Sequence, residues 1–384
     1  RRWIVIFVVL LAANSYFSSF QRTILTESIG FSALTVATSL LLDYLRTGRA
    51  VFLAGAALFV GLTIGIRPAG LMIAPMIPIA ALLKRKNRDV SAAVLALTTV
   101  VPILLGWASE RVLYRLEHGD RSETILPYIL TGKAAMLVRD DTTFVGPHAE
   151  ALRKLGTKLN EKYAPAHVFL EEMPSWVAWP VFTAYYEAAA QFQVIDRDLA
   201  QLAAKENTTT DVLRRELGEQ VIVSNPLGYF RLSLVHYLGQ WSITALAFPP
   251  AARAVNSYTE SVRSIPLYDV ITATPFNPTP SWKSLLTYPS FMVAGLVTFF
   301  LSLLLPRYLI WPAGYDNPRH CDLMVASFFA VMCHLSMLLT SFTNVSTPRF
   351  LMMVYPHILL AGLFLVRSLR PDWISDISGL AKNP

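Results

Sequence analysis

The chain has 384 residues, of which 54% are hydrophobic and only 15% are charged. Soluble domains carry roughly 25% charged residues, so this composition argues against a soluble protein. The net charge of +7 does not indicate nucleic-acid binding, because the excess Lys and Arg lie mostly in short loops between apolar stretches. A disulfide between the two cysteines, Cys321 and Cys333, is excluded, since one predicted helix separates them by about 18 Å.

Apolar stretches with almost no ionisable group recur along the chain. A helix of about 20 apolar residues crosses a bilayer, and backbone in hydrocarbon must satisfy its own hydrogen bonds. We therefore predict an all-α multi-pass membrane protein with about eight transmembrane helices. The predicted spans are 3–19, 27–45, 50–66, 68–83, 91–108, 284–305, 322–341 and 349–366.

These spans divide the chain into three parts. Residues 1–108 form an N-terminal bundle of five spans, and 284–384 form a C-terminal bundle of three spans with a cytoplasmic tail. Between them, residues 109–283 form a large, mainly helical extracytoplasmic segment. Because the chain starts at Arg1 without Met and enters an apolar stretch at once, we expect that further sequence precedes it.

The short basic loops predict the orientation. With Arg1 and Arg2 in the cytoplasm, every short basic loop falls on the cytoplasmic side, as the positive-inside rule requires. These loops contain Arg46 and Arg49, residues 84–88, Arg307 and Arg319, and Arg367 and Arg370. Both ends of the chain are then cytoplasmic. The family resemblance described below implies that the membrane is the bacterial inner membrane.

The extracytoplasmic segment contains two kinds of element. Residues 149–163 and 196–220 have helical periodicity, whereas 264–282 is rich in Pro and Thr and reads as an irregular linker. Two apolar stretches, 174–192 and 226–248, leave the number of crossings open. A single extra crossing would move the later basic loops outward, so zero or two crossings are favoured.

The stretch 226–248 is amphipathic. Its apolar stripe consists of Leu227, Phe230, Leu234, Leu238, Trp241 and Ala245, and its polar side of Ser233, His236 and Gln240. Such a helix suits the surface of a membrane. A core helix of a soluble outer domain is the alternative.

Charged residues gather at the predicted outer turns. Arg22 and Glu27 lie between the first two spans, Arg67 lies between the third and fourth, and Arg349 precedes the last. If the helices bundle, these groups converge on one outward-facing cavity. There are simpler explanations. Each Arg side chain would extend to a lipid headgroup, and the dipole at the helix N-terminus would stabilise the carboxylate of Glu27, with Thr26 as N-cap.

Other ionisable residues are weaker candidates. His334 and His357 fall within predicted spans, where a lone His is more often a hydrogen-bonding residue between helices. Asp140 and Asp141 read as a solvated loop, and Lys133 lacks the spacing of a phosphate-binding loop.

Three short motifs give the membrane part a family resemblance. They are LTESIGF with Glu27, GIRPAGL with Arg67 and TPRFLMMVYP with Arg349. In this order, and on one side of the membrane, they resemble the C-type membrane glycosyltransferases. That group includes the protein O-mannosyltransferases and the bacterial enzymes that transfer aminoarabinose to lipopolysaccharide. The resemblance covers the membrane part, and the outer segment has no counterpart.

The resemblance implies a transferase that uses a sugar on a polyprenyl phosphate and an extracytoplasmic glycan, lipid or protein as acceptor, with membrane lipids around it. Arg22, Arg67 and Arg349 would contact the substrate, and Arg67 and Arg349 its lipid phosphate. Arg, Lys or a divalent metal would stabilise the departing phosphate. In the family, the acidic base lies in the first outer loop, after the first span. No such loop precedes span 3–19 here, so either it belongs to preceding sequence or this chain lacks that chemistry, and Glu27 would have a supporting role.

Three other classes remain open, one of them a non-enzymatic membrane scaffold. A polysaccharide polymerase or ligase has similar hydropathy and a large outer loop. A transporter or flippase would show repeated halves, broken helices and charges near the midplane.

Overall fold

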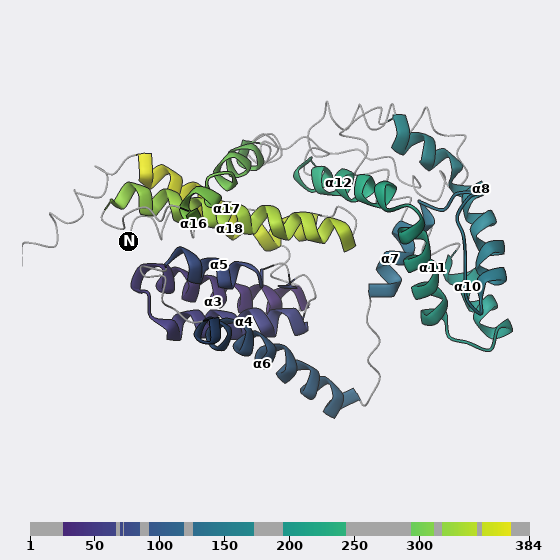
Figure 1. Ribbon diagram of the computed structural model, residues 1–384, viewed down its shortest axis with the longest axis horizontal. Coiled ribbons are helices and arrows are strands. Elements are labelled where there is room, and N and C mark those ends of the chain that lie inside the picture. The colour runs from purple at the N-terminus through teal and green to yellow at the C-terminus, as the bar shows by residue number, and fades with distance from the viewer. Residues whose placement is uncertain are drawn as a thin grey trace, which may run out of the picture. The chain divides into compact units, whose positions relative to one another are not determined.

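The computed structural model describes residues 26–66, 70–71, 73–84, 92–118, 126–172, 195–242, 293–310, 317–343 and 348–369. These residues form helices joined by turns and contain no strand, which confirms the predicted all-α class (Figure 1). The predicted span 3–19 and the stretches 174–192 and 264–282 lie outside them. The chain divides into two compact units, one of residues 1–122, 293–339 and 351–384, the other of 123–292 and 340–350.

The first unit begins with a hairpin of α3 (Thr26–Thr47) and α4 (Ala50–Ile66). Gly48 makes the turn at φ +72°, a conformation that glycine adopts without steric cost, and its N–H donates to the Tyr44 carbonyl at 2.7 Å. The two helices run antiparallel, so the start of α3 and the end of α4 lie at the same end of the hairpin.

The predicted span 68–83 is not one continuous helix. Of its described residues, 70–71 and 73–75 form tight turns and α5 (Met76–Leu83) is α-helical, which is about 12 Å of helix. Pro75 precedes α5 and cannot donate a helical hydrogen bond. A Cβ at Gly70 would lie 2.8 Å from the backbone nitrogen of Ile64, so this segment folds tightly back onto α4.

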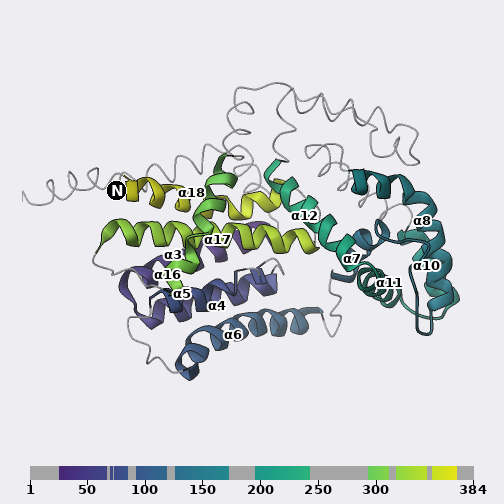
Figure 2. The same cartoon turned by 45° about the horizontal axis from the view of Figure 1, so that its top comes forward.

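The helices α4 and α6 (Ala92–His118) pack through glycines and lie side by side (Figure 2). A Cβ at Gly106 would lie 2.2 Å from the carbonyl oxygen of Leu58, and one at Gly61 would lie 2.1 Å from that of Ile103. Small residues let membrane helices approach this closely, where van der Waals contact replaces the hydrophobic effect as the driving force.

Three helices are long and apolar enough to cross a membrane: Ala93–Leu113, Val293–Ile310 and Pro318–Phe342. They indicate a membrane protein and coincide with the predicted spans 91–108, 284–305 and 322–341. Two shorter apolar helices, Ala50–Ile66 and Val354–Leu369, coincide with two more. The total of eight spans stays a prediction.

The side of α6 away from α4 is apolar and exposed. Leu97, Leu104, Leu105 and Leu113 are each more than half exposed. The helix Val293–Ile310, which ends in α16 (Leu305–Ile310), also exposes large apolar side chains, among them Leu296, Phe300 and Leu303. Contiguous apolar surface of this kind is unfavourable in water and matches a lipid environment.

Polar side chains tie the membrane helices together. The imidazole of His334, on α17 (Pro318–Thr343), lies 3.0 Å from the hydroxyl of Thr298. His357, on α18 (Pro348–Leu369), lies 2.9 Å from that of Thr38 on α3. Both distances confirm the interpretation of these histidines as hydrogen-bonding residues between helices.

The second unit contains α7 (Leu126–Ala135), α8 (Ala149–Glu172), α10 (Asp196–Lys205), α11 (Thr210–Ser224) and α12 (Pro226–Ser242). Helices are thus confirmed over 149–163 and within 196–220, with a break at 206–209 where Thr209 caps α11 by accepting from the Val212 N–H. Leucines at helical spacing form the core, including Leu152, Leu159, Leu199, Leu213 and Leu217.

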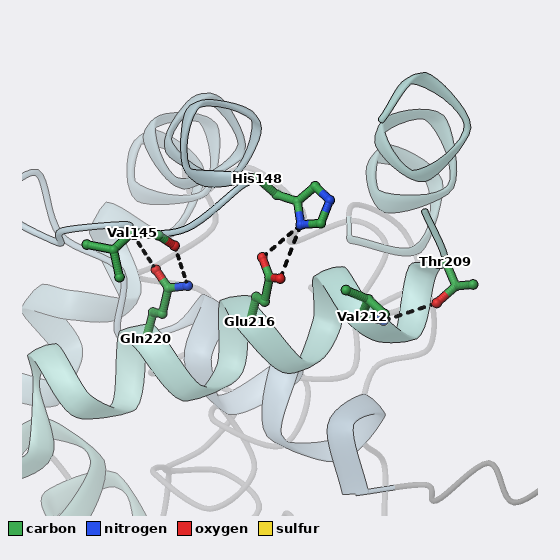
Figure 3. A network of polar contacts seen from close by, with 6 residues as sticks. All are labelled: Val145, His148, Thr209, Val212, Glu216 and Gln220. Atoms are coloured by element: carbon green, nitrogen blue, oxygen red, sulfur yellow. Dashed lines mark hydrogen bonds and ion pairs between the residues drawn. The ribbon is translucent and has the colours of Figure 1, made fainter. Parts of the chain in front are cut away.

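Side chains of α11 hold the loop that precedes α8 (Figure 3). The amide of Gln220 accepts from the Val145 N–H at 2.7 Å and donates to the Val145 carbonyl at 3.0 Å. One turn earlier, Glu216 pairs with His148 at 3.1 Å. The loop is therefore fixed at two points although Val145 itself is exposed.

Candidate functional site

The motif residues of the sequence lie at helix ends. Glu27 is the second residue of α3, Arg67 directly follows the end of α4, and Arg349 is the second residue of α18. Arg22 and Arg67 lie outside the described residues, and for Glu27 and Arg349 only the backbone is described. The helix boundaries thus agree with the turns that the sequence predicted, and the convergence of the four side chains stays a prediction.

The basic ends of the same helices gather at one end of the membrane unit. Lys84, after α5, donates from Nζ to the carbonyl of Arg46 at 3.5 Å, near the end of α3. Cys321, near the start of α17, interacts electrostatically with both Lys84 and Tyr308. Lys84, the end of α3 and the start of α17 are therefore neighbours in space.

The same end holds an ion pair between α17 and α18. Arg367 donates to Asp322 through Nε at 2.7 Å and through Nη2 at 2.5 Å, and Asp322 is only 3% exposed. This bidentate pair joins the beginning of one helix to the end of the next. Arg349 is at the other end of α18, about 27 Å along the helix from Arg367. Glu27 and Arg67 likewise flank the ends of α3 and α4 that face away from the basic loops.

A groove of about 100 Å³ lies between α3 and α18. Its lining is Phe31, Leu34, Thr35, Thr38, Ser39, Leu42, Pro356, His357 and Leu360. The Thr38 hydroxyl donates to the Leu34 carbonyl at 2.8 Å, so it accepts from the Nε2–H of His357. Among the described residues, the lining is mainly apolar with a few hydroxyl groups and one imidazole, which suits an apolar chain such as an acyl or isoprenoid group.

A buried polar cluster in the second unit was not predicted as a site. Lys133 of α7 is fully buried, and its Nζ lies 2.5 Å from His236 Nδ1 and 2.5 Å from the Ser341 carbonyl oxygen. Burial, and secondly the charge of Lys133, hold the pKa of His236 well below its usual value. The imidazole is therefore neutral at pH 7, and its Nδ1 accepts a hydrogen bond from the ammonium group.

This cluster is suited to fixing α12 in place. Ser341 lies near the end of α17, where the helix dipole favours a cation. Ser233 and Gln240 lie on the same side of α12 as His236, and all three are fully buried. Because Lys133 is inaccessible to solvent, we assign it to the attachment of α12 and not to a substrate. The sequence showed the polar side of α12 but no link to Lys133, which lies 103 positions away.

The described residues contain no group of three or more His, Cys, Asp or Glu side chains that could bind a metal ion.

Comparisons of the chain with protein-family models, with curated proteins and with solved structures gave no match. The resemblance to membrane glycosyltransferases therefore rests on the three motifs and on the helix ends that carry them.

Proposed function

We propose that this chain is an integral membrane glycosyltransferase that moves a sugar from a polyprenyl-phosphate carrier to an extracytoplasmic acceptor. One observation carries the proposal: Glu27 is at the end of α3 opposite Arg46, Arg67 follows the end of α4 in the chain, and Arg349 is at the end of α18 opposite Arg367. Charges are costly at membrane depth and are kept where they bind or react, so three motifs with this shared sidedness support a common site.

In the proposed reaction, the acceptor hydroxyl or amine attacks the anomeric carbon of the sugar. The bond between that carbon and the phosphate oxygen breaks, polyprenyl phosphate leaves, and the acceptor proton passes to a general base. Arg67 and Arg349 would hold the phosphate, for which the planar guanidinium is suited by its paired donors. Arg22 would contact the substrate and Glu27 would support the acceptor or the base. The apolar groove between α3 and α18 has the lining that an isoprenoid chain requires.

A transporter or flippase is the second candidate, because one observation favours it. A turn at residues 73–75 precedes the short helix α5, which begins after Pro75, and Pro102 and Pro356 lie inside α6 and α18. Broken helices of this kind line substrate paths in transporters.

One assay separates the two candidates. Purified protein in vesicles would receive a panel of labelled polyprenyl-phosphate sugars together with an acceptor extract, and the release of polyprenyl phosphate would be followed. We expect release by the wild type and its loss in Arg67→Ala and in Arg349→Ala. Arg46→Ala is the matched control, since Arg46 lies at the basic end and its highly exposed side chain makes a surface pair with Asp43. Movement of a labelled lipid across the bilayer without release, by folded protein, would refute the transferase and favour the transporter.

A further inference from the structure

The helix α12 exposes its apolar side and buries its polar side. Leu227 is 77% exposed, and Phe230, Leu234 and Leu238 are 51%, 39% and 42% exposed. The polar residues on the other side are fully buried. A core helix of a soluble domain would bury the leucines and expose the polar residues, so this arrangement calls for an apolar environment outside the protein.

The polar side of α12 supplies the reason for this orientation. His236 accepts from the buried ammonium group of Lys133, which also donates to the backbone of Ser341. Turning the helix to bury its leucines would break these bonds and leave a charged group buried without them, at a cost of several kcal/mol. Trp241 is the one member of the predicted stripe in the described range that is buried, and it lies in the last turn of α12.

The position of α12 identifies what covers the apolar stripe. The Tyr229 hydroxyl donates to the carbonyl of Phe342, and the rings of Tyr229 and Phe230 pack on the Phe342 ring with centroids 5.8 Å and 6.1 Å away. Phe342, which belongs to the same compact unit as α12, is the last residue of the helix Pro318–Phe342, which is long and apolar enough to cross a membrane. The apolar stripe thus begins where a span ends, which is the level at which acyl chains meet headgroups.

We propose that α12 is a membrane-surface helix and that the bilayer covers the stripe formed by Leu227, Phe230, Leu234 and Leu238. Leu227 and Leu238 are about 16 Å apart along the helix, and a helix in the membrane surface would hold both at the same shallow depth. A helix that crossed the membrane would place them at different depths. The proposal does not depend on the proposed transferase activity.

The test uses single fluorescent labels on cysteine variants of the full chain in vesicles, with Cys321→Ser and Cys333→Ala as background. The labelled variants are Leu227→Cys and Leu238→Cys. Val212→Cys is the matched control, because Val212 is 40% exposed on α11 and lies more than two helical turns from α12. Lipids with a nitroxide near the headgroup or near the bilayer centre would quench the labels, and unfolding midpoints would confirm that each variant is folded.

We expect both α12 labels to be quenched by the shallow nitroxide, more weakly by the deep one, and to the same degree at both positions. The Val212 label should show little quenching by either lipid. Unequal depths for the two α12 labels would refute a surface helix and indicate a crossing. Labels that no lipid quenches would refute lipid contact, and self-quenching that grows with protein density would indicate that a second copy covers the stripe.

Discussion

Replacing Gly106 with alanine is expected to destabilise the membrane unit although alanine is the better helix former. The added Cβ would lie 2.2 Å from the Leu58 carbonyl oxygen and within 2.8 Å of the Leu62 nitrogen, both of them backbone atoms of α4. A side chain in that place could rotate away, but the backbone of a packed helix cannot. The two helices must therefore separate by more than about 1 Å to reach ordinary contact distances.

The size of the effect follows from two opposing contributions. Overpacking a well-packed interface costs about 1–3 kcal/mol, and backbone contact places Gly106 at the upper end of that range. The helix propensity of alanine returns about 1 kcal/mol. We therefore expect Gly106→Ala to lower the free energy of unfolding by about 2 kcal/mol.

A second glycine supplies the control. Gly362 lies in α18, and a Cβ there would meet nothing within 4 Å. Gly362→Ala should therefore stabilise the protein by up to about 1 kcal/mol through helix propensity alone. The free energies would be compared by reversible unfolding in lipid–detergent micelles. Equal stability of Gly106→Ala and Gly362→Ala would show that α4 and α6 do not pack backbone to backbone and would refute the reasoning.

Three further predictions address polar contacts. Asp322→Asn should lower the free energy of unfolding by about 2 kcal/mol because it breaks a largely buried bidentate pair, whereas Asp43→Asn, which breaks an exposed pair, should cost at most about 0.5 kcal/mol in the same unfolding assay. The pKa of His236 is depressed in the folded protein, so the unfolded state binds the extra proton once the pH falls below the usual value of 6.5. As the pH falls below 6.5, the free energy of unfolding should therefore decrease more steeply for the wild type than for His236→Gln, and parallel curves for the two proteins would contradict this. Gln220→Ala should release the loop around Val145 and speed its cleavage by a protease, while an unchanged cleavage rate would show that Glu216 alone holds the loop.

The helices were readable from the sequence where apolar residues recur without charges. The spans 91–108, 284–305 and 322–341 each coincide with a helix long enough to cross a bilayer, because hydropathy and length decide that outcome locally. The segment 68–83 has the same hydropathy but is broken. Pro75 signals a break, but the close return of Gly70 onto α4 depends on contacts that hydropathy does not contain.

The candidate site was readable in part for the same reason. The helices α3 and α18 start at Thr26 and Pro348, one residue before the predicted span starts 27 and 349, whereas the turns that precede them lie outside the described residues. The convergence of side chains from separate turns depends on how the helices bundle. The pairing of Thr38 with His357, 319 positions apart, is an example that no local pattern contains.

For α12, the sequence pattern correctly predicts an amphipathic helix but does not determine which of its two sides faces the protein. The sequence gives two sides, one of leucines and one of Ser233, His236 and Gln240, but periodicity does not say which side faces the protein. In a soluble protein the leucines would face inward. Here Lys133 provides a hydrogen-bonding partner for His236 on the polar side and also bonds Ser341 near the end of α17, and the proposed membrane surface would cover the leucines on the other side. The orientation of the helix therefore depends on one buried lysine from a distant part of the chain, and removing that lysine should loosen α12 before it disturbs any span.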